Sequence, residues 1–145
     1  MVRNALLTLG IVLAAVIGFQ IVYTDDREAV EERLETLFEI AREGGEDAFD
    51  EIMASIADDY RGSGSFGRKY VERRLKAALV PAGTTTEIKH GGFSPVVKND
   101  EILVPIVSVQ AKIRGNAVRY AFAVTFAQRD GEWKIVNVTR MRLAE

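Results

Sequence analysis

The longest regular pattern of apolar positions runs from Glu101 to Arg142 and predicts three antiparallel strands. The turn dipeptides Gly115-Asn116 and Asp130-Gly131 separate them and suit two-residue hairpins. If Arg114 faces Ala117, one face of the first hairpin is bulky and apolar, and the other is small or polar. That alternation is typical of an antiparallel sheet that is covered on one face only. Pro105 predicts a bulge or an edge position, because proline cannot donate to the strand ladder.

Three amphipathic helices are predicted ahead of this meander. Apolar residues recur at helical spacing in the first, which Thr24 or Asp25 caps and Gly44-Gly45 ends. The second is predicted over 46–60 and the third over 68–80. Residues 84–97 then predict a strand or a bent pair of strands. The order of elements indicates an α+β domain in which helices cover the apolar face of a curved sheet.

An uncharged run at 5–23 precedes the helices. Nineteen helical residues span roughly 28 Å, close to the hydrocarbon thickness of a bilayer. Arg3 lies before the run and two aspartates follow it, which favours a cytoplasmic N-terminus and an extracytoplasmic domain. We therefore expect residues 1–24 to be a single-pass anchor in a bacterial inner membrane, and 25–145 to form the folded domain. A cleaved signal peptide is the alternative, although the small-residue site Val16-Ile17-Gly18 is a poor one.

Composition excludes several chemistries. The chain has 145 residues, enough for one domain, and no cysteine, so disulfides and thiolate sites are absent. The net charge is −2, which does not favour nucleic acid as a partner. Charge is nevertheless uneven: 14 acidic and three basic residues lie between Asp25 and Asp59, whereas 112–142 carries seven basic and two acidic residues. Two solvated faces of opposite sign explain this, and a charged partner surface is the alternative.

Three features stand out along the chain: the amphipathic opening helix, the segment Ile56-Ala57-Asp58-Asp59-Tyr60, and the closing segment Asp130-Gly131-Glu132-Trp133-Lys134-Ile135-Val136. In these features the chain resembles the NTF2-like (SnoaL-like, cystatin-cone) domains. The resemblance implies a cone-shaped sheet wrapped around helices, a pocket at the open end, and an outer sheet face that serves as a dimer interface. With an anchor, the chain also looks like VirB8-type secretion components and Mce-associated membrane proteins, which implies a scaffold in a secretion or transport apparatus.

Candidate catalytic groups are few. His90 is the single histidine, so any Ser-His-Asp set or histidine metal site needs it. Asp58 and Asp59 point about 100° apart on a helix, so at most one of them faces a pocket. An isomerase or dehydratase that uses His90 or Asp59 as base is an alternative function. The string Gly62-Ser63-Gly64-Ser65-Phe66-Gly67 matches a dinucleotide-binding pattern but lacks the required βαβ unit. We expect no catalytic residue, metal or cofactor.

A binding or assembly role for a small apolar ligand or a protein partner is the prediction that these patterns favour. The pocket candidates are mainly aromatic: Tyr60, Phe66, Tyr70, His90, Tyr120, Trp133 and Asn137. An aromatic core is the simpler explanation for most of them. Asn137 faces the pocket only if the last turn has two residues, because a three-residue turn with a bulge places Val136 and Val138 there instead.

A second copy is predicted to pack on the other face of the sheet. The small or polar residues of that face are centred on Gln110, Ala121, Ala123 and Thr125. In the predicted register Lys112 lies opposite Arg119, and like charges in that position destabilise a sheet unless an acidic partner covers them. A homodimer is therefore expected, with an ordinary solvated face as the alternative.

Overall fold

The computed structural model describes residues 26–62, 67–81 and 83–141. Residues 26–43 are helical and are followed by two shorter helices, α2 (Gly45–Ala54) and α3 (Arg68–Leu79). The strands are β1 (Thr85–His90), β2 (Val96–Lys98), β3 (Glu101–Ile113), β4 (Asn116–Arg129) and β5 (Glu132–Met141). They form one antiparallel sheet in the order β1-β3-β4-β5, with β2 also paired to β3. This confirms the predicted α+β class, with residues 84–97 folded as a bent pair of strands.

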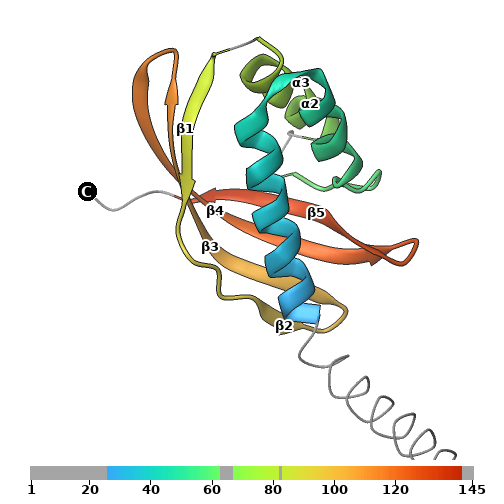
Figure 1. The fold of residues 1–145 in the computed structure, drawn as a ribbon. Helices are drawn as coiled ribbons and strands as arrows, with labels where there is room; N and C mark the ends of the chain where they lie inside the picture. Colours follow the sequence, from blue (N-terminus) through green and yellow to red (C-terminus); the bar gives the residue numbers. More distant parts are fainter. Residues whose placement is uncertain (1–25, 63–66, 82, 142–145) are drawn as a thin grey trace, which may run out of the picture.

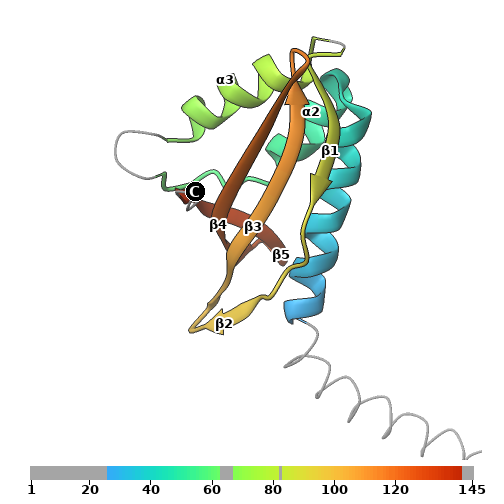
Figure 2. The same ribbon diagram turned by 90° about the vertical axis from the view of Figure 1, so that its left-hand side faces the viewer.

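The sheet curves around the helices, and the helix at 26–43 crosses its concave side (Figure 1). Gly44 ends that helix as predicted, with φ at 67° and its N–H donating to the carbonyl of Ile40 at 3.2 Å. One hydrophobic core fills the space between the helices and the concave face. Its most buried members are Val30, Ile102, Val104 and Phe126. A quarter-turn of the view shows the long β3 and β4 strands curving past the helices (Figure 2).

The second helix is shorter than predicted, because α2 ends at Ala54 instead of continuing to residue 60. The backbone beyond it pairs with β5. Ser55 accepts from the N–H of Ile135 at 2.8 Å, and Ala57 donates to the carbonyl of Ile135 at 2.9 Å. Arg61 donates to the carbonyl of Val136 at 2.8 Å. Residues 55–61 thus satisfy the outward backbone groups of β5, which outweighs continuation of the helix.

The first hairpin turn lies one residue earlier than predicted. Ile113 faces Asn116, and the two turn residues are Arg114 and Gly115, with φ of 52° and 80°. A turn with two positive φ values favours glycine in its second position, which Gly115 supplies here and Gly131 supplies in the next turn. The pairing is therefore shifted by two residues. Because side chains alternate with a period of two, the predicted faces survive this shift.

A bulge at Pro105 confirms the interruption that was predicted there. The pairing of β3 with β4 shifts between Val104 and Val107. Both of those valines are buried in the core, whereas Ile106 between them is 55% exposed. The extra residue lets two nearby valines face the core, and it places Ile106 on the outer face.

The last strand follows neither of the two simple registers. Arg129 faces Glu132 across a two-residue turn, so Trp133 and Ile135 lie on the concave side. The pairing then shifts at Val136, because Ile135 faces Phe126 while Asn137 faces Thr125. Beyond this bulge, each side chain of the strand points to the face opposite to the one that a regular strand would give it. Val138 joins the core, and Asn137 and Thr139 lie on the outer face.

The two edges of the sheet are partly closed by the chain itself. Arg42 donates from Nε to the carbonyl of Ile88 in the edge strand β1 at 2.9 Å. The pairing of β1 is also irregular between Thr86 and Lys89, where Glu87 has a φ of 53°. At the other edge, residues 55–61 cover the first half of β5. Such features hinder edge-to-edge pairing between molecules.

Within the described residues no helix combines the length and the hydropathy that a membrane span requires. The predicted span at 5–23 lies outside those residues.

Candidate functional site

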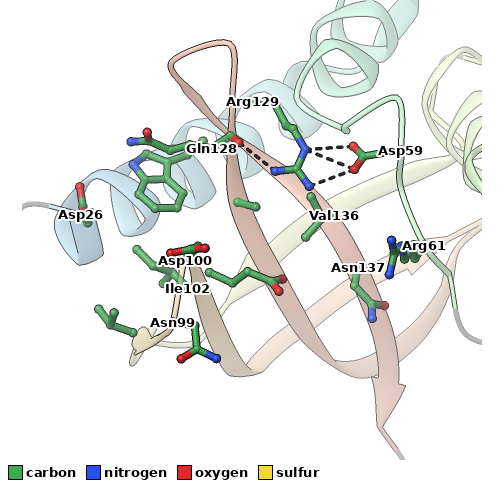
Figure 3. Close-up of a pocket in the computed structure, with 14 residues that line it drawn as sticks. Asp26, Asp59, Arg61, Asn99, Asp100, Ile102, Gln128, Arg129, Val136 and Asn137 are labelled. Carbon is green, nitrogen blue, oxygen red and sulfur yellow. Dashed lines mark hydrogen bonds and ion pairs between the residues drawn. The ribbon is translucent and has the colours of Figure 1, made fainter.

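A groove of about 980 Å³ lies at one end of the sheet, where the β2–β3 turn and the β4–β5 hairpin approach the first helix (Figure 3). Nine of its fourteen lining residues are charged or carry an amide, and five are apolar. The lining comprises Asp26, Asp59, Arg61, Val97, Asn99, Asp100, Glu101, Ile102, Ala127, Gln128, Arg129, Trp133, Val136 and Asn137. A site with this many charges differs from the mainly aromatic, apolar pocket that the sequence predicted.

The strongest polar contact in the groove joins Asp59 to Arg129 (Figure 3). The guanidinium donates from Nε to both carboxylate oxygens, at 3.1 and 3.3 Å, and from its terminal nitrogen to Oδ2 at 2.9 Å. These hydrogen bonds lower the pKa of Asp59 from its ordinary value. A carboxylate held in this way is a weaker base, so the pair ties residues 55–61 to the β4–β5 hairpin rather than preparing proton transfer.

The remaining charges divide between the two ends of the groove. Asp26 and Asp100 lie on one side, near Gln128, whereas Arg61 lies beside Asn137 at the other end (Figure 3). Asn137 also has a buried side-chain oxygen with no hydrogen-bond partner. That atom is shielded from the solvent in the groove, so it is a buried polar group that the structure leaves unsatisfied.

Two of the predicted pocket residues, Trp133 and Asn137, line this groove. Tyr60 lies elsewhere and packs against the core, where burial raises the pKa of its hydroxyl although a backbone hydrogen bond from Val138 acts in the opposite direction. Tyr120 packs on Phe122 with ring centroids 6.0 Å apart. Its ring also lies 4.6 Å from the guanidinium carbon of Arg140. The structure therefore does not bring the predicted pocket residues together.

The other candidates are also dispersed. His90 is half-buried on the concave side, with its ring 4.6 Å from that of Phe38 and 4.8 Å from that of Phe93. Its Nδ1 lies 2.7 Å from the carbonyl oxygen of Gly91. Tyr70 is on α3, at 36% exposure. Phe66 lies outside the described residues, as does most of the glycine-rich stretch around it. Among the residues described, no cluster of three or more potential ligands could hold a metal ion.

The predicted partner face does form a continuous surface on the outer side of the sheet. Ser108 faces Ala121, Gln110 faces Arg119, and Ala123 faces Thr139. Sequence reasoning missed the larger apolar side chains around this centre. Val96 lies on the same face because it pairs with Leu103, which in turn faces Thr125. Three large hydrophobic residues on this side are strongly exposed: Val96 at 49%, Ile106 at 55% and Met141 at 38%.

One argument for an acidic partner on that face was wrong. Lys112 lies opposite Ala117 rather than opposite Arg119, because the hairpin turn starts one residue earlier. It instead pairs with Glu87 of β1 at 3.2 Å. The sheet therefore satisfies Lys112 internally, and the predicted repulsion between like charges does not arise.

Comparisons with known proteins identify the fold. No family model matches the chain, and no curated protein matches its sequence. Many solved structures are similar to it. An NTF2-like protein of unknown function from Pseudomonas putida KT2440 has 12% identity and a TM-score of 0.64, covering 81% of this chain and 86% of that one. An NTF2-like protein with a cystatin-like fold from Novosphingobium aromaticivorans has 17% identity and a TM-score of 0.63, covering 86% of both chains.

A further similar structure is described as a putative calcium/calmodulin dependent protein kinase II association domain from Xanthomonas campestris. It has 13% identity and a TM-score of 0.59, covering 80% of this chain and 86% of that one. At these identities the likeness concerns the fold alone. The order of elements, the curved sheet and the helix on its concave side agree with that likeness, and the chain has the NTF2-like, cystatin-like fold.

Proposed function

We propose that this protein is a membrane-anchored assembly module that binds a second copy of itself through the outer face of its sheet. The observation that carries the proposal is the exposed apolar rim of Val96, Ile106 and Met141 around the small residues Ala121 and Ala123. Small residues at the centre allow two sheets to approach closely. The larger side chains at the rim gain the most when water is removed from them.

The charges of this face suit a two-fold arrangement. Arg119 lies toward the β3–β4 turn, whereas Glu101 lies at the other end of the sheet, opposite Ala127. A two-fold axis that runs across the strands brings the basic end of one copy over the acidic end of the other. Such an arrangement would fix how the two sheets align on each other, whereas the stability of the contact would come mainly from buried apolar area.

An anchor at residues 5–23, with Arg3 inside and the aspartates outside, would place the module on the extracytoplasmic side of a bacterial inner membrane. Two chains tethered in one membrane meet at a high effective concentration, so a modest interface is sufficient. A scaffold of a secretion or transport apparatus would use the same face for a different protein.

An enzyme with His90 or Asp59 as base has less support. The hydrogen bond from Arg129 lowers the pKa of Asp59, and His90 packs between two phenylalanine rings. Neither group lies with a second polar group in an apolar pocket, which is the arrangement that such a reaction needs.

The test compares two alanine-to-glutamate variants of the full-length chain in detergent, with mass measured by light scattering. Wild type should be dimeric, and Ala123→Glu should be monomeric, because it places an unpaired charge at the centre of the contact. Ala77→Glu makes the same change on an exposed position of α3 and should stay dimeric. A wild-type chain that is monomeric at high micromolar concentration, or a dimeric Ala123→Glu chain, would refute the proposal.

A chemical cross-link gives an independent measurement. Because the chain has no cysteine, Ala123→Cys introduces a single thiol at the centre of the face. A short bismaleimide should join two such chains, whereas a thiol at position 77 should react without forming dimers. Equal cross-linking at both positions would indicate random collision instead of a specific interface.

A further inference from the structure

The groove at the end of the sheet has a charge pattern of which the assembly proposal uses only Glu101. Its lining includes four carboxylates and two guanidinium groups. Asp59 and Arg129 neutralise each other through their hydrogen bonds. Three carboxylates, Asp26, Asp100 and Glu101, then exceed the single free guanidinium of Arg61.

Other groups in the wall are suited to the same kind of ligand. Trp133 lines the groove, and an indole ring attracts an ammonium or guanidinium group through its π-system. The amide side chains of Asn99 and Gln128 also line the groove, and their oxygens can accept from the N–H groups of an ammonium or guanidinium ion. Acceptors, negative charge and an aromatic surface thus share one open cavity.

We propose that this groove binds an organic cation that carries ammonium or guanidinium groups, with the charge held between Asp100 and Trp133. The volume of about 980 Å³ is large enough for an extended ligand. The acidic end, with Asp26 and Asp100 near Gln128, receives the cationic group, at the opposite end of the groove from Arg61 (Figure 3). A free polyamine and a lysine side chain of a peptide offer the same chemistry.

Trp133 is the only tryptophan of the chain, so its fluorescence reports on this groove directly. The experiment titrates the full-length protein in detergent with spermidine and, in a parallel series, with tri-lysine amide. Sodium chloride at matched ionic strength is the blank. A saturable change that salt weakens is the expected result. A stronger response to tri-lysine would indicate a peptide as the natural source, and a stronger response to spermidine a polyamine.

Variants distinguish the groove from the general negative charge of the helices. Asp100→Asn should raise the dissociation constant about two- to five-fold, the range of an exposed ion pair. Adding Glu101→Gln should weaken binding further. Asp50→Asn makes the same change on an exposed position of α2 outside the groove and should have no effect. A response that does not saturate, or equal weakening by Asp50→Asn, would overturn the proposal.

The same titration separates this site from the assembly face. The Ala123→Glu chain leaves every lining residue of the groove in place, so it should bind the cation at least as tightly as wild type. If it binds but wild type is also monomeric, the groove stands and the assembly proposal fails. If wild type is dimeric but no variant responds to either cation, only the groove proposal fails.

Discussion

The two faces of the sheet are built from the same strands but differ in how far their apolar side chains are buried. On the concave face Ile102, Val104 and Phe126 are almost fully buried by the helices of the same chain. On the outer face Ile106 and Val96 are about half exposed. The fold therefore completes one hydrophobic surface by itself and leaves the other to solvent or to a partner.

The outer face is not open along its whole length. At one end Ala57, Ala127 and Val136 form a small buried cluster of their own. Residues 55–61 cover this end because their backbone pairs with β5. Residues 55–61 therefore bury this end of the outer face, whereas Val96 and Ile106 elsewhere on the face stay exposed.

The largest effect is expected on the concave face. Phe126 has no exposed surface, and Phe126→Ala removes most of its side chain from the centre of the core. The free energy of unfolding should fall by about 3–5 kcal/mol, from lost transfer energy and the cavity left behind. Urea denaturation followed by circular dichroism measures this loss. A fall below 1 kcal/mol would show that the concave core is much looser than the structure indicates.

A smaller effect is expected where the outer face is covered. Ala127 is 3% exposed, in contact with Ala57 and Val136. Ala127→Leu should overpack this cluster and cost about 1–3 kcal/mol. The matched change Ala123→Leu, in the open region of the same strand, should cost almost nothing. Equal losses at the two positions would remove the distinction between the covered and open parts of the face.

A still smaller change in stability is expected at the rim. Ile106→Ala should alter the free energy of unfolding of the isolated chain by less than about 0.5 kcal/mol, since its side chain is already half exposed. The same variant should weaken the dimer, measured as a shift of the monomer–dimer midpoint to higher concentration. A large loss of stability with unchanged association would show that Ile106 serves the fold alone.

The smallest effect concerns the Asp59–Arg129 pair and depends on pH. The pKa of Asp59 is lowered from its ordinary value of 3.8 by Arg129. The pair therefore stabilises the fold above that value and loses its contribution as the pH falls through the lowered pKa. Wild type should melt slightly above Asp59→Asn at neutral pH, and the two should converge in acid. Both side chains are largely exposed, which keeps the difference small. A difference that grows in acid would contradict this assignment.

Sequence reasoning located the elements well because their hydrophobic periods are regular. The faces of β3 and β4 were also predicted, although the turn at Gly115 was misplaced, since a shift of two residues leaves side-chain direction unchanged. The bulge at Val136 was not predicted. It lies where residues 55–61 bond to the backbone of Ile135 and Val136, a long-range contact that no local pattern reveals.

The candidate site was less predictable than the fold. Trp133 and Asn137 both line the groove, but Asn137 lies on the outer face and not on the concave face that the two-residue turn predicted. The groove takes its charged residues from the first helix, the β2–β3 turn, residues 59–61 and the β4–β5 hairpin. Side chains so distant in sequence meet only through the curvature of the sheet.

The coverage of the two sheet edges has a consequence for the kind of assembly that this chain can form. The side chain of Arg42 donates a hydrogen bond to a carbonyl of β1, and the backbone of residues 55–61 forms hydrogen bonds with the first half of β5. Growth by adding strands to an edge would continue without limit and produce fibres. A contact between two identical faces uses each face once and ends there. These short contacts therefore disfavour growth through either edge, and the proposed face-to-face dimer would be a finite complex.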